Sequence, residues 1–355
     1  MKNIWWMMMA VVSVLFLWSS CSAGEAIDDE SPVVPARVAI GFANGSVSSS
    51  VTVRGITPLE DHHSTMGVWG WETATDGTDN MLFRNQEVDF DSLKNDWIYS
   101  PVKYWINECQ YRFYAYAPYN TAATITAENG QMSIHNVHLT GVNLQGVASD
   151  SLKESFLGTA DTDWMVAREG VSVPGTYRYK VKFFMQHILS KFVVTMRKSD
   201  ALAADSNVTK VVLNSMTIGA WASKGDFDQK LNHTPVPTDS ADLATCEWTL
   251  DPAAARYTLA MTESCEVDKA EKYIFESLAL PQTITDDMCV KMRYTMTFSD
   301  GREEHYLYTL KLNEAFDVLC AGNCYKLHFI ISPDCIRFDS GVDEWSIRQT
   351  GDGNI

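Results

Sequence analysis

The sequence predicts an all-β protein of two tandem antiparallel β-sandwich domains, and three observations lead to this fold class. Apolar and polar residues alternate with a period of two through both halves of the chain, the pattern of strands with one buried and one exposed face. No segment longer than three turns shows helical spacing, which excludes doubly wound and helical folds. The length of 355 residues, 46% of them hydrophobic, suffices for two such domains.

The first twenty residues have the features of a bacterial lipoprotein signal peptide. Residues 4–18 are apolar apart from Ser13, and this run is too short to span a bilayer, which takes about 20 residues. The small residues Ser19 and Ser20 then precede Cys21, so that residues 17–21 resemble a lipobox. We therefore expect residues 1–20 to be removed and Cys21 to carry acyl chains such as palmitate, each buried CH₂ adding about 0.8 kcal/mol of membrane affinity. A membrane-spanning helix is the alternative.

An acidic tether and two domains are expected after the signal. Residues 21–36 contain the run Asp28-Asp29-Glu30 and two prolines, a composition typical of a solvated linker. The polar stretch of residues 199–207 is the best boundary within the remaining chain. We therefore predict an N-terminal sandwich domain over residues 37–199 and a C-terminal sandwich domain over residues 200–355.

Three segments carry the strand pattern most clearly. In residues 177–183, 290–298 and 325–331, large apolar side chains alternate with polar ones. Asp300-Gly301 and Gly322-Asn323 are turn signals beside two of these segments, which predicts antiparallel hairpins. Residues 111–116 form a further, aromatic strand pattern, and we expect their side chains to pack in the core. Pro118 is expected to end this strand because proline cannot donate a hydrogen bond to a β-ladder.

The cysteines of the mature chain leave the disulfide pairing open. Beyond Cys21 they are Cys109, Cys246, Cys265, Cys289, Cys320, Cys324 and Cys335. This odd number leaves at least one thiol without a partner inside an exported chain. The run from Cys320 to Cys324 is either a metal clip or a turn between strands. We favour the turn, because no second close pair of Cys or His completes a tetrahedral site.

Charge and motifs exclude several classes of function. A formal net charge of −17 with scattered Lys and Arg leaves no basic surface for nucleic acid. There is no Gly-rich phosphate loop and no nucleophile elbow. His62-His63 and the pair His135 and His138 lack a Cys, Asp or Glu at ligand spacing, so surface histidines are the simpler interpretation. We therefore predict no catalytic residue, no metal ligand, no cofactor and no enzymatic activity.

Several local patterns follow one another along the mature chain. They are Val51-Thr52-Val53-Arg54-Gly55, Met66-Gly67-Val68-Trp69, Tyr104-Trp105 with Tyr111-Arg112-Phe113-Tyr114-Ala115-Tyr116-Ala117-Pro118, Asp163-Trp164-Met165-Val166-Ala167, Phe183-Phe184 with His187, Leu189-Ser190-Lys191, Lys224-Gly225-Asp226-Phe227, and Leu280-Pro281-Gln282. With residues 325–331 and Trp345, they resemble the fimbrillin family of Bacteroidales, the subunits of type V pili. The resemblance covers nearly all of the mature chain.

The resemblance implies transthyretin-like sandwich domains and assembly by strand exchange. Family members arrive at the outer membrane as lipoproteins, and an arginine-specific protease there removes the N-terminal strand. The cut is expected between Arg54 and Gly55, after the stretch of residues 47–53, whereas the alternative at Arg37 would leave the first strand in place. A strand of another fimbrial subunit would then fill the apolar groove. The expected partners are this protease, other subunits, and a host or bacterial surface ligand that the sequence does not identify.

The C-terminal tail predicts the position of the subunit. A donor strand needs four or five apolar residues at alternating positions. Beyond Ser340 the apolar residues are Val342, Trp345, Ile347 and Ile355, of which only Trp345 and Ile347 are in step. We therefore expect a tip or accessory subunit rather than a stalk subunit. The protein is expected to be anchored first to the cell outer membrane and then to become part of an adhesive fimbria. Donation by residues 335–338 after partial unfolding of the last strands is the alternative.

A surface glycan-binding lipoprotein is the alternative function. Sugar rings stack on exposed tryptophans, and the chain has 11 Trp residues, although three of them lie in the signal. Three triplets, Asp91-Ser92-Leu93, Asp150-Ser151-Leu152 and Asp239-Ser240-Ala241, also resemble an O-glycosylation pattern. These triplets are candidate modification sites.

Overall fold

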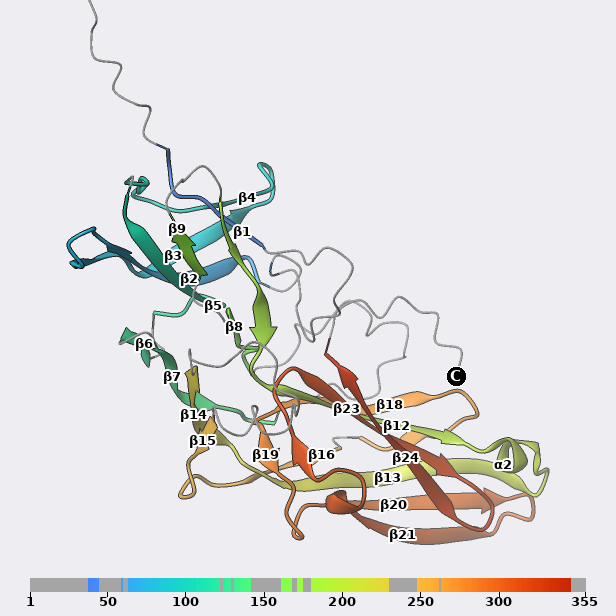
Figure 1. Ribbon diagram of the computed structural model, residues 1–355. Helices are drawn as coiled ribbons and strands as arrows, with labels where there is room; N and C mark the ends of the chain where they lie inside the picture. Colours follow the sequence, from blue (N-terminus) through green and yellow to red (C-terminus); the bar gives the residue numbers. More distant parts are fainter. Residues whose placement is uncertain are drawn as a thin grey trace, which may run out of the picture. The chain divides into compact units, whose positions relative to one another are not determined.

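A computed structural model of the chain shows a β-protein (Figure 1). The structure describes residues 38–44, 59, 63–106, 108–121, 124–128, 131–141, 161–167, 171–174, 180–229, 248–261 and 263–345. Within these ranges the strands form five sheets, and the only helices are α2 (Asp200–Ala204) and the 3-10 turn η4 (Leu312–Glu314). None of the described helices is long and apolar enough to cross a membrane. The prediction of an all-β fold is confirmed.

Sheet I has nine strands, all from the chain up to His187. Their order is β10-β1-β4-β3-β2-β5-β8-β11, with β9 paired to β5. The strands are β1 (Phe42–Asn44), β2 (Thr65–Thr73), β3 (Asp79–Asp91), β4 (Asp96–Ile98), β5 (Gln110–Ala117), β8 (Met165–Ala167), β9 (Val171–Pro174), β10 (Val181–Phe183) and β11 (Met185–His187). The first described strand of the chain, β1, thus lies inside the sheet and not at its edge.

Close packing between β2 and β5 explains two sequence motifs. Gly67 lies opposite Tyr116, and a Cβ added at Gly67 would lie 2.2 Å from a ring carbon of that tyrosine. Only glycine fits this position, because such a contact is far inside the sum of atomic radii. In β5 itself, Tyr111, Phe113 and Tyr116 are fully buried, and the strand ends at Ala117, immediately before Pro118. Both expectations for this aromatic strand are confirmed.

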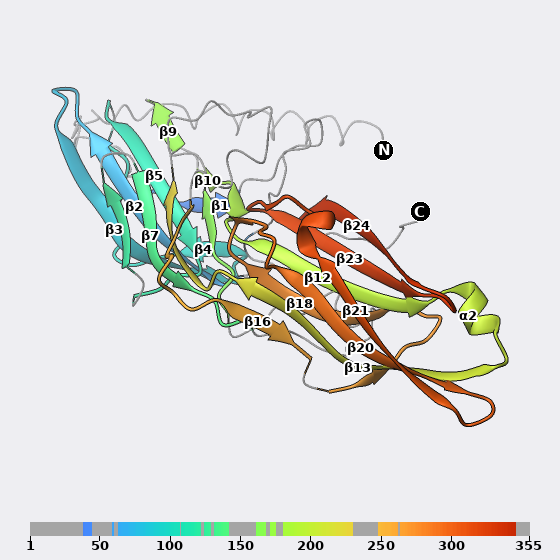
Figure 2. The same cartoon turned by 90° about the horizontal axis from the view of Figure 1, so that it is seen from below.

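Sheets III and IV form a sandwich in the C-terminal half. Sheet III has the order β18-β12-β23-β24, and sheet IV has the order β16-β13-β20-β21 with β17 paired to β13. The strands are β12 (Ser190–Lys198), β18 (Lys272–Ala279), β23 (Asn323–Ile331), β24 (Ile336–Glu344), β13 (Val208–Trp221), β16 (Tyr257–Ala260), β17 (Cys265–Glu266), β20 (Cys289–Phe298) and β21 (Glu303–Lys311). Figure 2 shows the long strands of both sheets running side by side.

One hydrophobic core joins these two sheets. It contains Phe192 and Val194 of β12, Leu327 of β23, and Met292 and Met296 of β20, all at most 2% exposed. Buried and exposed residues of β20 alternate from Val290 to Tyr294, as the period-two pattern predicted, and Thr295 interrupts the pattern because it is buried as well. The hairpin of β20 and β21 is antiparallel with Gly301 in its turn at φ +83°, and this prediction is also confirmed. One pair in sheet III, β12 with β23, is parallel.

Sheet II connects distant parts of the sequence. It has the order β15-β14-β7-β6, with β6 (Thr124–Glu128), β7 (Gln131–His138), β14 (Lys224–Gln229) and β15 (Trp248–Leu250). The small sheet V pairs β19 (Gln282–Thr283) with β22 (Val318–Leu319). Strands from both sides of the predicted boundary at residues 199 and 200 therefore share sheets II and III. The domain limits themselves stay a prediction, and at this boundary Ser199 caps α2 by accepting a hydrogen bond from the amide of Leu202.

The run from Cys320 to Cys324 forms a turn between strands, as predicted. Both thiols are buried, and Gly322 adopts a positive φ of 70° that suits glycine. Burial raises the pKa of the Cys324 thiol to about 11. Cys265, Cys289, Cys324 and Cys335 are free thiols, and Cys246 lies outside the described residues. Within the described ranges no group of three or more His, Cys, Asp or Glu side chains is placed to hold a metal ion.

Candidate functional site

The candidate functional site is the slot in sheet I that residues 38–44 occupy. Phe42, Ala43 and Asn44 pair in parallel with Val181, Lys182 and Phe183 of β10. On the other side Phe42 pairs in antiparallel fashion with Trp97 of β4. The segment is therefore flanked by β10 on one side and by β4, with the chain that follows β4, on the other.

Hydrogen bonds secure the segment along both of its sides. The amide of Ile40 donates to the carbonyl oxygen of Lys103, and the amide of Trp105 donates to the carbonyl oxygen of Val38, each at 2.9 Å. On the β10 side the amide of Val181 donates to the carbonyl oxygen of Gly41 at 2.8 Å. Without this segment, each of these groups on the neighbouring strands would lose its main-chain partner.

A side chain also forms a hydrogen bond with the main chain of this segment. The Tyr99 hydroxyl donates to the carbonyl oxygen of Ile40 at 2.7 Å. Burial raises the pKa of the Tyr99 phenol, so the hydroxyl keeps its proton and remains a donor at neutral pH. Because this bond goes to a backbone atom, it is available to any strand in the slot.

The inner face of the segment fills an aromatic pocket. Ile40 is 1% exposed and Phe42 is completely buried. The Phe42 ring lies 5.4 Å from the ring centroids of Phe83 and Tyr99, 5.6 Å from that of Phe183 and 6.1 Å from that of Phe113. Burial of such side chains stabilises a fold by about 1.5 to 3 kcal/mol each. An empty slot would expose this pocket together with unpaired backbone groups.

The outer face of the segment carries only small residues, and an ion pair crosses it. Nζ of Lys180 lies 2.5 Å from Oδ1 of Asp96, and both side chains are partly exposed. A Cβ added at Gly41 would lie 3.0 Å from Cγ of Lys180 and 3.6 Å from its Cδ and Cε. The aliphatic part of Lys180 thus packs over the backbone at Gly41.

The predicted processing residues lie outside the described part of the chain. This holds for Cys21, Arg54 and Gly55, and also for the stretch of residues 47–53 that was expected to form the first strand. The structure describes a strand ahead of this stretch, β1 (Phe42–Asn44), which lies between Arg37 and Arg54. Its signal in the sequence is the run Val38-Ala39-Ile40-Gly41-Phe42-Ala43, in which large and small residues alternate with no polar residue.

The position of β1 distinguishes the two candidate cleavage sites. Between Arg37 and Arg84, the only Lys or Arg is Arg54. Arg84 lies in β3, which is paired on both sides within sheet I. A cut after Arg37 would leave β1 attached, whereas a cut after Arg54 would separate β1 covalently from the rest of the sheet.

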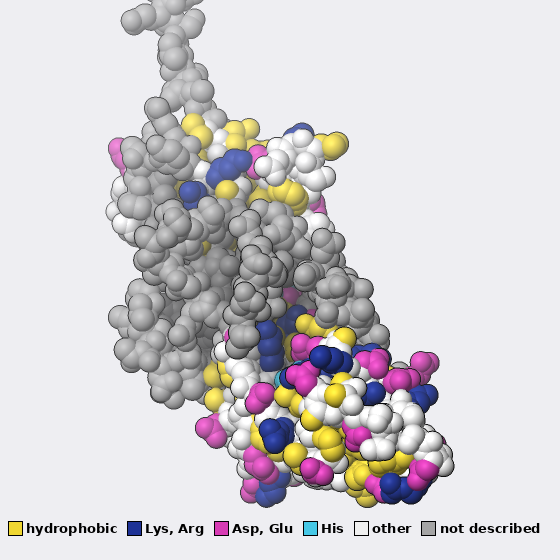
Figure 3. Space-filling view, turned by 90° about the vertical axis from the view of Figure 1, so that its right-hand side faces the viewer, with side chains coloured by type: hydrophobic (Ala, Val, Ile, Leu, Met, Phe, Trp, Pro, Cys, Tyr) yellow, Lys and Arg dark blue, Asp and Glu magenta, His cyan; other side chains and the backbone are white. Residues whose placement is uncertain are grey.

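Exposed apolar side chains lie beside the slot. Val102, Tyr104 and Ile106 are exposed and alternate with the half-buried Lys103 and the buried Trp105 in the segment bonded to Val38 and Ile40. Phe184, which follows β10, is 39% exposed. Figure 3 shows hydrophobic side chains at the surface among polar ones, both in its upper part, the end that holds sheet I, and in its lower part. Clustered exposed apolar groups are typical of surfaces that contact other proteins.

A buried histidine holds the last described residue of the chain. Nδ1 of His187 lies 3.0 Å from Oδ1 of Asp163, and the imidazole stacks on Trp345 at 3.8 Å between ring centroids. Nε2 of His63 lies 2.9 Å from the carbonyl oxygen of Asp163, and burial lowers the pKa of His63. His187 is a fully buried, packed side chain. In this state Trp345 packs against its own subunit.

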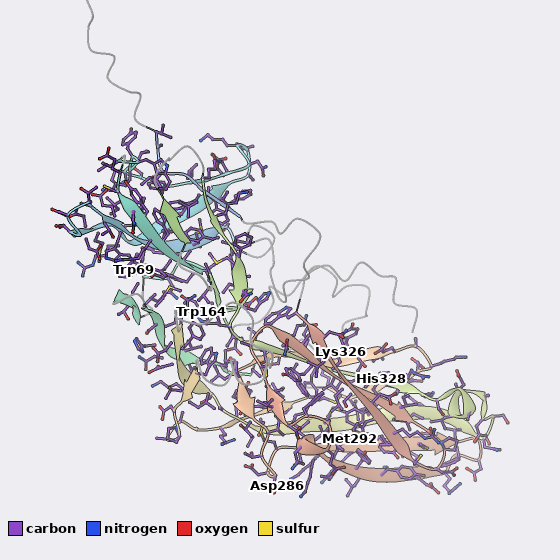
Figure 4. All side chains as sticks on the ribbon, in the orientation of Figure 1. Trp69, Trp164, Asp286, Met292, Lys326 and His328 are labelled. Carbon is purple, nitrogen blue, oxygen red and sulfur yellow. The ribbon has the colours of Figure 1, made fainter. Side chains whose placement is uncertain are left out.

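Most of the tryptophans in the described part of the chain are buried, so few of their rings are exposed. Trp69, Trp97, Trp105, Trp164, Trp221, Trp248 and Trp345 are buried, and Trp71 is half-buried. Figure 4 labels Trp69 and Trp164, which both belong to the core that joins sheets I and II. Of the three candidate glycosylation triplets, only Asp91-Ser92-Leu93 is described, and Leu93 is 97% exposed in the turn before β4.

The chain is similar to one known protein family and to several solved structures. A fimbrillin-like family model matches residues 57–345. A fimbrial protein from Bacteroides vulgatus ATCC 8482 has a similar fold, with a TM-score of 0.56 and 13% identity over 86% of this chain and 99% of that one. The tip fimbrial protein Mfa3 from Porphyromonas gingivalis, with a C-terminal truncation, gives a TM-score of 0.33 and 10% identity over 87% of this chain and 98% of that one. No curated protein matches the chain.

Proposed function

The chain belongs to the fimbrillin-like family, and we propose that it is a fimbrial subunit that assembles by strand exchange at the β1 slot. The coarse role follows from the family, which places the protein in a cell-surface appendage in contact with other fimbrial subunits. We propose a structural and adhesive role rather than a catalytic one. The exchange mechanism is our proposal.

One observation carries the mechanism: a buried interior strand is joined to the rest of its sheet through Arg54. β1 has partners on both sides and fills an aromatic pocket, so its loss would expose main-chain groups and apolar surface together. A strand from another subunit would restore both. Main-chain hydrogen bonds would then supply affinity, and alternating side chains would supply register.

The experiment that tests this function starts from the purified full-length chain without its signal. Trypsin is expected to shorten the protein to a chain that begins Gly55-Ile56-Thr57, and N-terminal sequencing reads this directly. After cleavage, addition of a second, strand-donating fimbrial subunit is expected to give complexes whose formation light scattering follows. Cleavage only after Arg37, or clean cleavage at Arg54 with no complex formed, contradicts strand exchange.

The same measurement tests the position of the subunit in the fimbria. We propose that it is a tip or accessory subunit. Trp345 packs on His187, and beyond it only Ile347 is in step with it as a donor residue. The polar residues 349–354 would bury poorly in an apolar slot. Cleaved protein alone is therefore expected to stay small. Long homopolymers that vanish when residues 346–355 are deleted would instead indicate a stalk subunit.

We also propose that the precursor is lipid-anchored at Cys21 in the outer membrane and cut there by an arginine-specific protease. Replacement of Cys21 by Ser is expected to move the protein from the membrane fraction to the soluble fraction of the cells that express it, because several acyl chains supply the membrane affinity. Immunoblotting of the two fractions measures this, and Cys335→Ser is the matched control because it keeps Cys21. Membrane attachment of the Cys21→Ser variant with labelled fatty acid still incorporated contradicts the proposal.

A further inference from the structure

An ion pair crosses the outer face of the β1 slot. A groove that accepted any apolar strand would not require it. Lys180 precedes β10, so the parallel register that pairs Phe42 with Val181 places Lys180 beside Gly41. The antiparallel register that pairs Phe42 with Trp97 places Asp96 across from Ala43. The ion pair of Lys180 with Asp96 therefore crosses the outer face of β1 from one neighbouring strand to the other.

This crossing limits what the enclosed strand carries on its outer face. Cγ, Cδ and Cε of Lys180 all lie within 4 Å of a Cβ built at Gly41, so the contact involves the length of the side chain and not only its tip. Movement of Lys180 away from the strand would give up its ion pair with Asp96. On the inner face, by contrast, the pocket takes the large side chains of Ile40 and Phe42.

We propose that the slot selects strands with an aliphatic residue, a glycine, an aromatic residue and a small residue in succession, and that Lys180 and Asp96 enforce the glycine. This inference rests on the proposed strand exchange and names the partner: a strand of another subunit that matches Ile40-Gly41-Phe42-Ala43 and runs parallel to β10. The tail of the chain itself reads Trp345-Ser346-Ile347-Arg348, with the aromatic residue first and Arg at the second small position. A second copy of this chain is therefore not the preferred donor.

The first test uses the full-length chain, in which the chain's own β1 occupies the slot. Within a strand, replacement of glycine by a β-branched residue normally stabilises the sheet. Here Gly41→Val is expected to lower the melting temperature by about 3 °C or more, because the new side chain meets Lys180. Lys180→Ala in the same chain is expected to recover at least half of this loss, whereas Lys182→Ala, the matched change two residues along, is not. A Gly41→Val chain as stable as the unchanged chain overturns the inference.

The second test measures exchange into the trypsin-cleaved protein. A fluorescent peptide with the sequence of residues 38–48 is compared with the same peptide carrying Val at the Gly41 position. The glycine peptide is expected to bind at least about tenfold more tightly, and Lys180→Ala in the protein is expected to reduce this ratio to about threefold or less, with Lys182→Ala again as control. Equal binding of both peptides to the unchanged protein overturns the selection alone. If Gly41→Val lowers the melting temperature of the full-length chain as expected but neither peptide binds the cleaved protein, strand exchange itself is overturned.

Discussion

Replacement of Phe42 by Ala is expected to lower the free energy of unfolding by about 3 to 5 kcal/mol, the usual range for loss of a fully buried phenylalanine. The Phe42 ring is completely buried among Phe83, Tyr99, Phe113 and Phe183, and truncation would leave a cavity whose walls, held by other strands, have little freedom to collapse. Denaturation by urea, followed by tryptophan fluorescence, measures the loss.

A matched control for this change lies next to the slot. Phe184 follows β10 and is 39% exposed, so Phe184→Ala is expected to cost about 1 kcal/mol or less. Similar losses for the two variants would mean that β1 does not contribute to the core as its burial indicates. The Phe42→Ala chain should also release β1 more readily after cleavage, because Ile40 and the hydrogen bonds would then hold it without the large Phe42 ring.

Replacement of Arg54 by Ala is expected to abolish assembly. No other Lys or Arg lies between Arg37 and Arg84, so an arginine-specific protease or trypsin has no other place at which to separate β1 from the folded sheet. The uncut strand would remain covalently attached at a very high effective concentration, and an incoming strand could not compete with it. Sequencing of the treated chain together with light scattering after addition of a donor subunit measures both steps.

Arg37→Ala provides the comparison for this variant. It removes the neighbouring arginine on the other side of β1 but leaves the Arg54 site, so processing at Gly55 and assembly are expected to proceed as in the unchanged chain. Assembly of the Arg54→Ala variant at the normal rate would refute proteolytic release of β1. Loss of assembly in the Arg37→Ala variant would instead indicate that the cut falls ahead of β1.

Residue pattern alone determined the fold class and several strands. Period-two alternation gave the strand of residues 290–298 and that of residues 325–331, since a strand with one buried face must alternate along its own length. Gly301 marked a hairpin and Pro118 a strand end, because both effects are local to the backbone. The fimbrillin resemblance likewise rested on local motifs, and the family model matches the chain over residues 57–345.

Only the tertiary structure shows where β1, the strand that we propose is exchanged, lies in its sheet. Residues 38–43 alternate large with small rather than apolar with polar, and the reason is visible only in the sheet: one face fills the aromatic pocket, and Lys180 and Asp96 cross the other. The pairing of β1 with β10 and of β12 with β23 joins segments more than 100 residues apart. Such pairing depends on complementary surfaces that meet only after folding, and no period within either strand records its partner.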